Sequence, residues 1–301
     1  MKITWLLVIV LVISVSSIAV LVYHSSFLIP RRPTIEGKDL FGIDEIYPTK
    51  KGGREWYIDM ENPFSDDLFS NSFDRNITKQ QDGSWHIAGP AVRLNVGTPP
   101  NVEVWKNVEI TGYAKVTEPI PSTSSTSSET ADDNGNGGDG EERDFTSDLD
   151  WRARGGRHNN EHPCDGNAYI GTIDIDGYVR WKKEIWHTGG YTDARAVDKA
   201  TDSIVGRWIG WKVVIYNIKN NTAVKLESYL DDKNNNEWTK VTDLVDDGGW
   251  YANSSDKEFY SAGCGRPKDY IITNGGPIVT FRSDNMIWDF KNLSVREINP
   301  A

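Results

Sequence analysis

The sequence predicts an all-β protein, a jelly-roll β-sandwich of antiparallel strands, preceded by one N-terminal transmembrane helix. Three observations carry this prediction. Residues 3–23 form one uncharged, mostly apolar run. After residue 40, short runs of alternating apolar and polar residues recur between Gly, Asn and Asp turns, and no stretch has the longer repeat of a helix. The composition, with 27 Gly and 13 Pro, is typical of strands and turns.

The N-terminal segment, residues 1–24, is predicted to be a membrane anchor or a signal segment. At about 1.5 Å per residue, the run of residues 3–23 is long enough to cross a bilayer core. An uncleaved anchor is favoured because apolar residues continue beyond a candidate cleavage site at Ser17-Ile18-Ala19. Cleavage, which would release a secreted protein, stays open. Residues 25–40 are predicted to form a stalk, and residues 41–301 the β-sandwich domain.

Two signals conflict over the side of the membrane on which the domain lies. Lys2 precedes the helix, whereas Arg31, Arg32 and Lys38 follow it, so the positive-inside rule alone would place the domain in the cytoplasm. A pair of cysteines and four glycosylation sequons favour the outside. We therefore expect a single-pass cell-membrane protein, or a secreted one after cleavage, with its domain outside the cytoplasm. The sequons begin at Asn76, Asn220, Asn253 and Asn292.

The two cysteines, Cys164 and Cys264, are predicted to form a disulfide, because an even and sparse count accompanies an export signal. Two separate buried thiols are the alternative. The formal net charge is −11. Much of it lies in residues 118–148, a Ser/Thr/Gly-rich stretch with nine acidic residues and one Arg, which predicts a disordered insert. The rest has no basic excess, so we expect no nucleic-acid partner.

The clearest strand is residues 102–116, where Val108, Ile110 and Ala114 fall on one face and Glu109 and Tyr113 on the other. Another follows the Asp82-Gly83 turn. Two hairpins and two closing strands complete the prediction. They lie at residues 168–174 with 178–186, 208–217 with 223–230, and then 278–282 and 290–298.

Three passages resemble the concanavalin A-like lectin/glucanase jelly rolls. They are residues 105–113, residues 210–217 continuing to 224–231, and residues 280–284 running into 290–298. The resemblance implies a concave sheet that binds glycans, as in the lectins, glucanases and polysaccharide lyases of that superfamily. The Glu-x-Asp-x-x-Glu strand of its glucanases is absent, so glycoside hydrolysis is disfavoured.

The candidate substrate-binding residues are arginines suited to a carboxylate or sulfate, charged residues that alternate on one strand face, and tryptophans that could stack on a sugar. Arg152 and Arg154 are expected on one face, opposite Trp151. The glycan-binding hypothesis requires Trp105, Glu109, Arg154 and Glu184 to share one solvent-open sheet. The full set is Trp105, Glu109, Arg152, Arg154, Arg157, Lys182, Glu184 and Trp186.

The leading hypothesis is a membrane-anchored protein that binds a polysaccharide without cleaving it. The first alternative is a polysaccharide lyase that cleaves a uronate glycan by β-elimination, with Arg154 neutralising the carboxylate and His158, His187 or Tyr191 as base and acid. The second alternative is a surface adhesin that binds protein.

No cofactor is predicted. A Ca²⁺ site is conceivable in the loop from Asp232 to Asp243, where Asn234 and Asn236 also offer oxygen atoms. Glu237 occupies the position that such a loop reserves for Gly. A polar hairpin is therefore the favoured interpretation of this segment.

Overall fold

The computed structural model describes residues 36–72, 76–98, 104–121, 147–156, 161–187, 190–253 and 264–300. Among these residues, no helix has the length and apolar character needed to cross a membrane. The predicted anchor at residues 3–23, most of the insert at 118–148, and the site candidates Arg157 and His158 lie outside the described residues.

The chain divides into two compact units, Met1–Asp44 and Glu45–Ala301. In the described part of the first unit, the Asp39 carboxylate accepts hydrogen bonds from the backbone N–H groups of Phe41 and Ile43, both at 2.9 Å. Lys38 and Asp44 form an ion pair across this turn.

The second unit is built of antiparallel β-strands and three short 3-10 helices, as far as the described residues extend. The helices are η1 (Pro63–Ser65), η2 (Pro163–Asp165) and η3 (Lys219–Asn221). The strands are β1 (Glu55–Tyr57), β2 (Phe69–Ser72), β3 (Thr78–Lys79), β4 (Trp85–Val96), β5 (Val108–Pro119), β6 (Asp148–Gly155), β7 (Ala168–Asp174), β8 (Tyr178–Glu184), β9 (Arg195–Lys199), β10 (Trp208–Ile218), β11 (Ala223–Asp231), β12 (Thr239–Asp246) and β13 (Ile278–Glu297).

Strand β13 connects the two halves of the sheet, whose order is β12-β11-β10-β5-β13-β6-β7-β8-β9. Its first part, Ile278–Asp284, pairs with β6, and its later part, Met286–Glu297, pairs with β5. The two strands predicted at 278–282 and 290–298 are therefore one strand. They are continuous because β4 pairs with β13 across the junction, from Val279 to Phe290.

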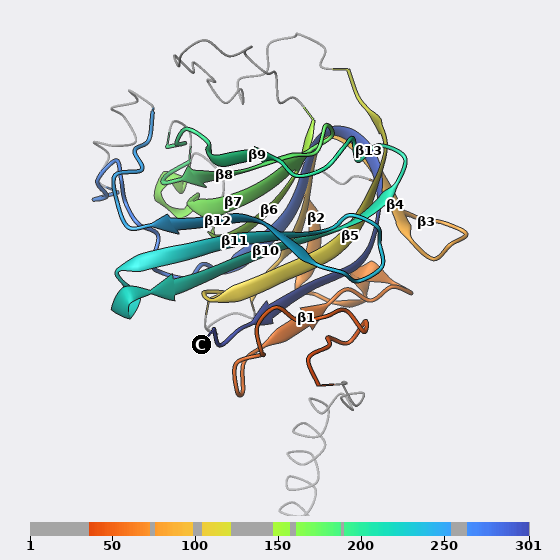
Figure 1. Cartoon of the computed structure of the whole chain (residues 1–301), viewed down its shortest axis with the longest axis horizontal. Helices are drawn as coiled ribbons and strands as arrows, with labels where there is room; N and C mark the ends of the chain where they lie inside the picture. The colour runs from red at the N-terminus through yellow and green to blue at the C-terminus, as the bar shows by residue number, and fades with distance from the viewer. Residues whose placement is uncertain are drawn as a thin grey trace, which may run out of the picture. The chain divides into compact units, whose positions relative to one another are not determined.

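The two halves fold over each other as the layers of a sandwich, with β6–β9 (green) in one layer and β10 and β11 (cyan) in the other (Figure 1). A Cβ atom on Gly171 of β7 would lie 2.6 Å from Val213 Cγ2 of β10, so the layers need glycine there. Trp181 Nε1 donates to Thr242 Oγ1 across the sandwich at 2.8 Å. The layers therefore enclose one core, and its largest buried side chains include Trp151, Trp181 and Trp211.

The alternation predicted for residues 102–116 is confirmed from Val108 onward, where β5 begins. Val108, Ile110 and Ala114 are fully buried on the inner face. Glu109 belongs to the opposite face and is also buried, because the backbone N–H groups of Ile46 and Tyr47 lie over it, 3.1 and 3.3 Å from Glu109 Oε2.

The core contains a fully buried ion pair between the layers. Lys183 Nζ of β8 lies 2.8 Å from Asp246 Oδ2 of β12, and the Tyr169 hydroxyl donates to the same oxygen at 2.6 Å. Burial lowers the pKa of Lys183 although Asp246 opposes the shift. Each member of this cluster has a partner, which is the condition under which buried charge is tolerated.

The predicted disulfide is confirmed, since Cys164 and Cys264 are bonded to each other across 100 residues of sequence. It ties the segment after β6 to the segment before β13. A cross-link that closes so long a loop restricts the unfolded chain strongly.

We expect the Cys164→Ser/Cys264→Ser variant to lose about 2–5 kcal/mol of unfolding free energy relative to the oxidised protein. Denaturant unfolding of both, without reductant, measures this difference. Reductant should shift the midpoint of the wild type only. Equal midpoints for variant and wild type would contradict a stabilising role.

Candidate functional site

The candidate site is the outer face of the layer that contains β4, β13, β6, β7 and β8, here called the arginine face. Trp151, Phe281 and Trp181 on these strands point into the core, so their sequence neighbours point outward. Residues paired directly across neighbouring strands share a face, which assigns the members of the arginine face. They are Arg93, Asn95, Asp148, Asp150, Arg152, Thr172, Asp174, Arg180, Lys182, Glu184, Thr280, Arg282 and Asp284.

One row of this face runs across five strands. Asn95 of β4 pairs with Thr280 of β13, which pairs with Arg152 of β6. Arg152 pairs with Ile170 of β7, and Ile170 pairs with Lys182 of β8. These five residues are half-buried except for Ile170, which is buried. At about 4.8 Å between strands the row is roughly 19 Å long. It carries amide, hydroxyl, guanidinium and ammonium groups, of which the Asn95 amide donates to Ser72 Oγ at 2.7 Å and the Thr280 hydroxyl to Asn95 Oδ1 at 2.8 Å.

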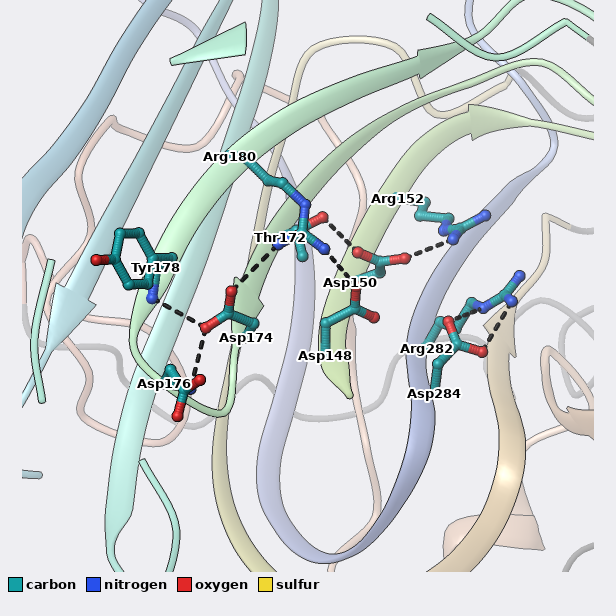
Figure 2. Close-up of polar contacts among 10 residues, drawn as sticks. All are labelled: Asp148, Asp150, Arg152, Thr172, Asp174, Asp176, Tyr178, Arg180, Arg282 and Asp284. Carbon is teal, nitrogen blue, oxygen red and sulfur yellow. Dashed lines mark hydrogen bonds and ion pairs between the residues drawn. The ribbon is translucent and has the colours of Figure 1, made fainter. Parts of the chain in front are cut away.

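A second row carries the ion pairs, and Figure 2 shows them. Arg152 pairs with Asp150 on its own strand, and Asp150 also accepts a hydrogen bond from the Thr172 hydroxyl. Arg282 of β13 binds Asp284 through two hydrogen bonds of 2.7 and 2.8 Å.

Arg180 of β8 binds two carboxylates of the same network. Its Nη2 lies 2.6 Å from Asp148 Oδ2, and its Nη1 lies 3.4 Å from Asp174 Oδ2. The four carboxylates of Asp148, Asp150, Asp174 and Asp284 thus meet the three guanidiniums of Arg152, Arg180 and Arg282.

The pKa values of Asp148 and Asp150 shift in opposite directions. Burial, together with Asp150 and Asp284, raises the pKa of Asp148 well above its ordinary value. Burial acts on Asp150 in the same direction, but Arg152 and Arg282 outweigh it and lower the pKa of Asp150. Of this coupled pair, Asp148 therefore keeps its proton to the higher pH.

Asp148, Asp150 and Asp284 are also the residues that could hold a metal ion, since one oxygen of each lies within 4.8 Å of the others. Hard cations such as Ca²⁺ prefer carboxylate oxygens. Each of the three carboxylates already pairs with an arginine, however. The donor set fits a cation in geometry but is largely neutralised by guanidinium.

Three of the predicted residues, Glu184, His187 and Tyr191, lie together at the end of β8. Tyr191 forms a β-bridge with Glu184, and the Glu184 Oε1 atom is 3.8 Å from His187 Nδ1. Burial, and then the charge of Glu184, raises the pKa of Tyr191, whereas Arg152 and Arg282 act in the opposite direction. Tyr191 is therefore a protonated phenol at neutral pH, next to a guanidinium and a carboxylate.

Two predicted substrate-binding residues do not lie on this face. Glu109 is fully buried on the other layer, where Lys212 Nζ and Arg296 Nη2 contact it at 2.8 and 2.9 Å. Burial opposes its charge, but these two cations lower the pKa of Glu109. Trp105 is 2% exposed, and the Arg54 guanidinium lies 4.6 Å from its ring centroid. The prediction of a glycan contact is wrong for both.

The glycan contacts predicted for Arg154 and Trp186 are also wrong. Arg154 has a φ of 68°, and the pairing of β6 with β13 shifts register beside it, so its side chain does not follow Arg152. It is buried, its Nε donates to the Lys106 carbonyl at 3.1 Å, and burial lowers its pKa to about 10. Trp186 follows the end of β8 and is buried in a cluster with Ile185.

The requirement that Trp105, Glu109, Arg154 and Glu184 share one open sheet is therefore not met. Of these four, only Glu184 belongs to the arginine face, where it lies beside Tyr191. The candidate site shifts to Arg152, Lys182, Glu184, His187 and Tyr191, joined by residues that the sequence reading missed. Those residues are Arg93, Asn95, Asp148, Asp150, Thr280, Arg282 and Asp284.

The loop considered for Ca²⁺ is a polar hairpin between β11 and β12. Asp232 pairs with Arg207 at 2.7 Å, and Asp243 pairs with Lys225 and with Lys240. Basic side chains thus already occupy the carboxylates that a cation would need.

The chain matches no protein-family model and no curated protein sequence. Solved structures similar to it include peanut lectin with a nine-residue peptide, at 8% identity and a TM-score of 0.36, covering 83% of this chain and 99% of the lectin. An endo-β-1,4-glucuronan lyase from the fungus Trichoderma reesei is 8% identical, with a TM-score of 0.42 and coverage of 80% and 94%. The potassium-bound carbohydrate recognition domain of Emp46p is 8% identical, with a TM-score of 0.43 and coverage of 84% and 100%.

All three structures are 8% identical to this chain with TM-scores below 0.5, so these similarities assign no function to this chain. Roles for individual residues are therefore argued from this chain alone.

The paired charges of the arginine face give a stability prediction. Asp150→Asn should lower the unfolding free energy at neutral pH by about 3–5 kcal/mol, because it leaves buried guanidinium without its counter-charge. Asp148→Asn should lower it by less than Asp150→Asn does, since the raised pKa of Asp148 means that folding already disfavours its charged form.

The raised pKa of Asp148 predicts how the unfolding free energy changes with pH. Because the pKa of Asp148 is raised on folding, its contribution is fully present below the ordinary carboxyl pKa and is lost as pH rises through the folded value. Asp148→Asn should remove that loss. Denaturant unfolding between about pH 4 and pH 8 tests this, and a variant that loses stability with pH as the wild type does would contradict it.

Proposed function

We propose that this protein binds an anionic polysaccharide across its arginine face, with Arg152 as the principal ligand of a uronate carboxylate. The observation that carries the proposal is the state of Arg152. Its guanidinium uses Nη2 on Asp150, while its Nε is a buried donor with no acceptor among the described residues. An unmet buried donor is costly, and an oxygen from a ligand would satisfy it.

The surroundings of Arg152 suit a sugar chain. Asn95, Thr280 and Lys182 lie in the same row and offer the mixed donors and acceptors that hydroxyl groups require. Tyr191, half-buried, adds an aromatic surface next to the guanidinium. A planar guanidinium that can bind two oxygens favours carboxylate over neutral sugars.

The proposal places the domain outside the cytoplasm, held at the cell membrane by residues 3–23 or secreted after cleavage. The disulfide between Cys164 and Cys264 supports an oxidising compartment. Three of the sequon asparagines, Asn76, Asn220 and Asn253, are exposed, as glycosylation there would require.

Arg152→Ala should weaken binding to a polyuronate such as alginate by roughly 10- to 100-fold, the effect of losing charged hydrogen bonds worth about 1.5–3 kcal/mol. Arg152→Lys keeps the positive charge but loses the planar guanidinium that can bind two oxygens. It should therefore weaken binding by less than Arg152→Ala does. Affinity electrophoresis in gels that contain alginate or neutral dextran measures both.

The matched control is Arg207→Ala, which removes a half-buried arginine that pairs with Asp232 away from the arginine face. It should bind as the wild type does. An unchanged affinity for Arg152→Ala, or no binding of any glycan by the wild type, would overturn the proposal, and the latter would favour a protein-binding adhesin.

A second function, uronate lyase, is favoured by the grouping of Arg152, Glu184, His187 and Tyr191. With Arg152 neutralising the carboxylate, the His187 imidazole would take the C5 proton. The electron pair left at C5 forms the C4–C5 double bond, the C4–O bond breaks, and the leaving oxygen takes the proton of the Tyr191 hydroxyl. Tyr191 is protonated at neutral pH and so carries a proton to give, although the burial that raises its pKa also makes it a weaker acid.

If the protein is a lyase, it releases unsaturated products from alginate, seen as rising ultraviolet absorbance. Tyr191→Phe should then lower the rate by about 10²–10⁴-fold while alginate affinity stays within a few-fold, since only the proton donor is lost. No absorbance change from a wild type that binds alginate would leave binding alone as the function.

A further inference from the structure

Arg282 is held by a carboxylate of its own strand in the way a glycan carboxylate would hold it. Arg282 Nε and Nη2 donate to the two oxygens of Asp284 at 2.7 and 2.8 Å (Figure 2). This parallel, two-bond arrangement is the strongest geometry between guanidinium and carboxylate. The face of Arg282 best suited to an anionic ligand is thus already taken.

Asp284 and Asp150 differ in their burial and in the number of side chains that they bind. The Asp150 side chain is 6% exposed and is bonded to both Arg152 and Thr172. The Asp284 side chain is 22% exposed, and within the described residues its hydrogen bonds go to Arg282. Asp284 is therefore nearer to solvent than Asp150 and has fewer partners to give up when it turns away from its arginine.

Arg282 lies next to the proposed ligand site. It is opposite Asp150 on β6, and Thr280, two residues earlier on β13, is opposite Arg152. The two guanidiniums are thus diagonal neighbours on one face, a separation of about 7–8 Å or less between side chains. A single oxyanionic group can reach both.

We propose, resting on the glycan-binding function above, that Asp284 is an internal substitute for the oxyanion of the glycan. When a uronate carboxylate or a sulfate ester binds at Arg152, it takes the place of Asp284 on Arg282, and the Asp284 carboxylate moves into water. No covalent bond changes. Arg282 thereby becomes a second ligand, and Asp284 sets the selectivity.

The selectivity follows from the exchange. The oxyanion carries a negative charge, as Asp284 does, so the Arg282 guanidinium keeps a counter-charge after the exchange. A neutral hydroxyl cannot offset the loss of that ion pair, so neutral glycans are rejected. Carboxylate and sulfate share this chemistry, and the choice of polymer in the test separates them.

The test measures the affinity of the full chain for alginate, dextran sulfate and neutral dextran, in the wild type and in Asp284→Asn. The variant should bind the preferred anionic polymer about tenfold more tightly, because one competing like charge is removed at contact distance. Neutral dextran should remain unbound. If only alginate binds more tightly, the ligand is a carboxylate. If only dextran sulfate binds more tightly, the ligand is a sulfate.

Two controls make the result specific. Asp232→Asn removes the same charge at a carboxylate that pairs with Arg207 away from the arginine face, and should leave affinity within about twofold of the wild type. Repeating the comparison in an Asp148→Asn background prevents that neighbour from taking up the charge that Asp284 loses.

The outcomes separate the two proposals. A wild type that binds no anionic polymer contradicts the glycan-binding function itself. A wild type that binds, with a folded Asp284→Asn variant of equal or weaker affinity in both backgrounds, overturns only the exchange at Arg282. An equal gain in Asp232→Asn would also overturn it, since a general charge effect would then explain the result.

Discussion

The pairing of β13 with both layers is the constraint on which the rest of the structure depends. This twenty-residue strand contributes to one layer through β6 and to the other through β5, with β4 alongside the junction. Its alternation buries Val279 and Phe281 in the core. The same alternation turns Arg282 and Asp284 outward beside Asp150 of β6. Without this register the arginines of the two strands would not share a face.

Charged side chains on the two outer faces of the sandwich differ in whether their hydrogen bonds are satisfied within the protein. On the β5 side, Glu109 is enclosed by Lys212, Arg296 and the backbone of residues 46–47, so its charge is matched inside the protein. On the arginine face, Arg152 retains a donor without an acceptor among the described residues. We regard the first arrangement as structural and the second as the one suited to an external ligand.

The sequence predicted the fold through features that depend on local order. The alternation of β5 and the hairpin of β7 and β8 follow from residue patterns within one or two strands, and both are present. Arg152, Lys182 and Glu184 were placed on their outward faces for the same reason. Arg154 was misplaced because its left-handed backbone breaks the alternation, and no residue type in that position signals it.

The remaining site could not be predicted because it depends on contacts between distant segments. Arg282 lies beside Arg152 only through the pairing of β13 with β6, more than 100 residues apart in the chain. Glu109 lies on the predicted face of β5, but it is covered by residues 46–47, about 60 positions earlier in the chain. Trp105 and Trp186 are buried by such contacts too, and a tryptophan in a core has the same sequence pattern as one that stacks on a sugar.

The most direct measurement is a crystal structure of the protein with a short uronate oligosaccharide bound. We predict that a sugar carboxylate lies within hydrogen-bonding distance of the Arg152 guanidinium, with the chain running across β13, β6 and β8. An oligosaccharide on the outer face of β10–β12, or at a site that leaves Arg152 in contact with Asp150 alone, would contradict the account.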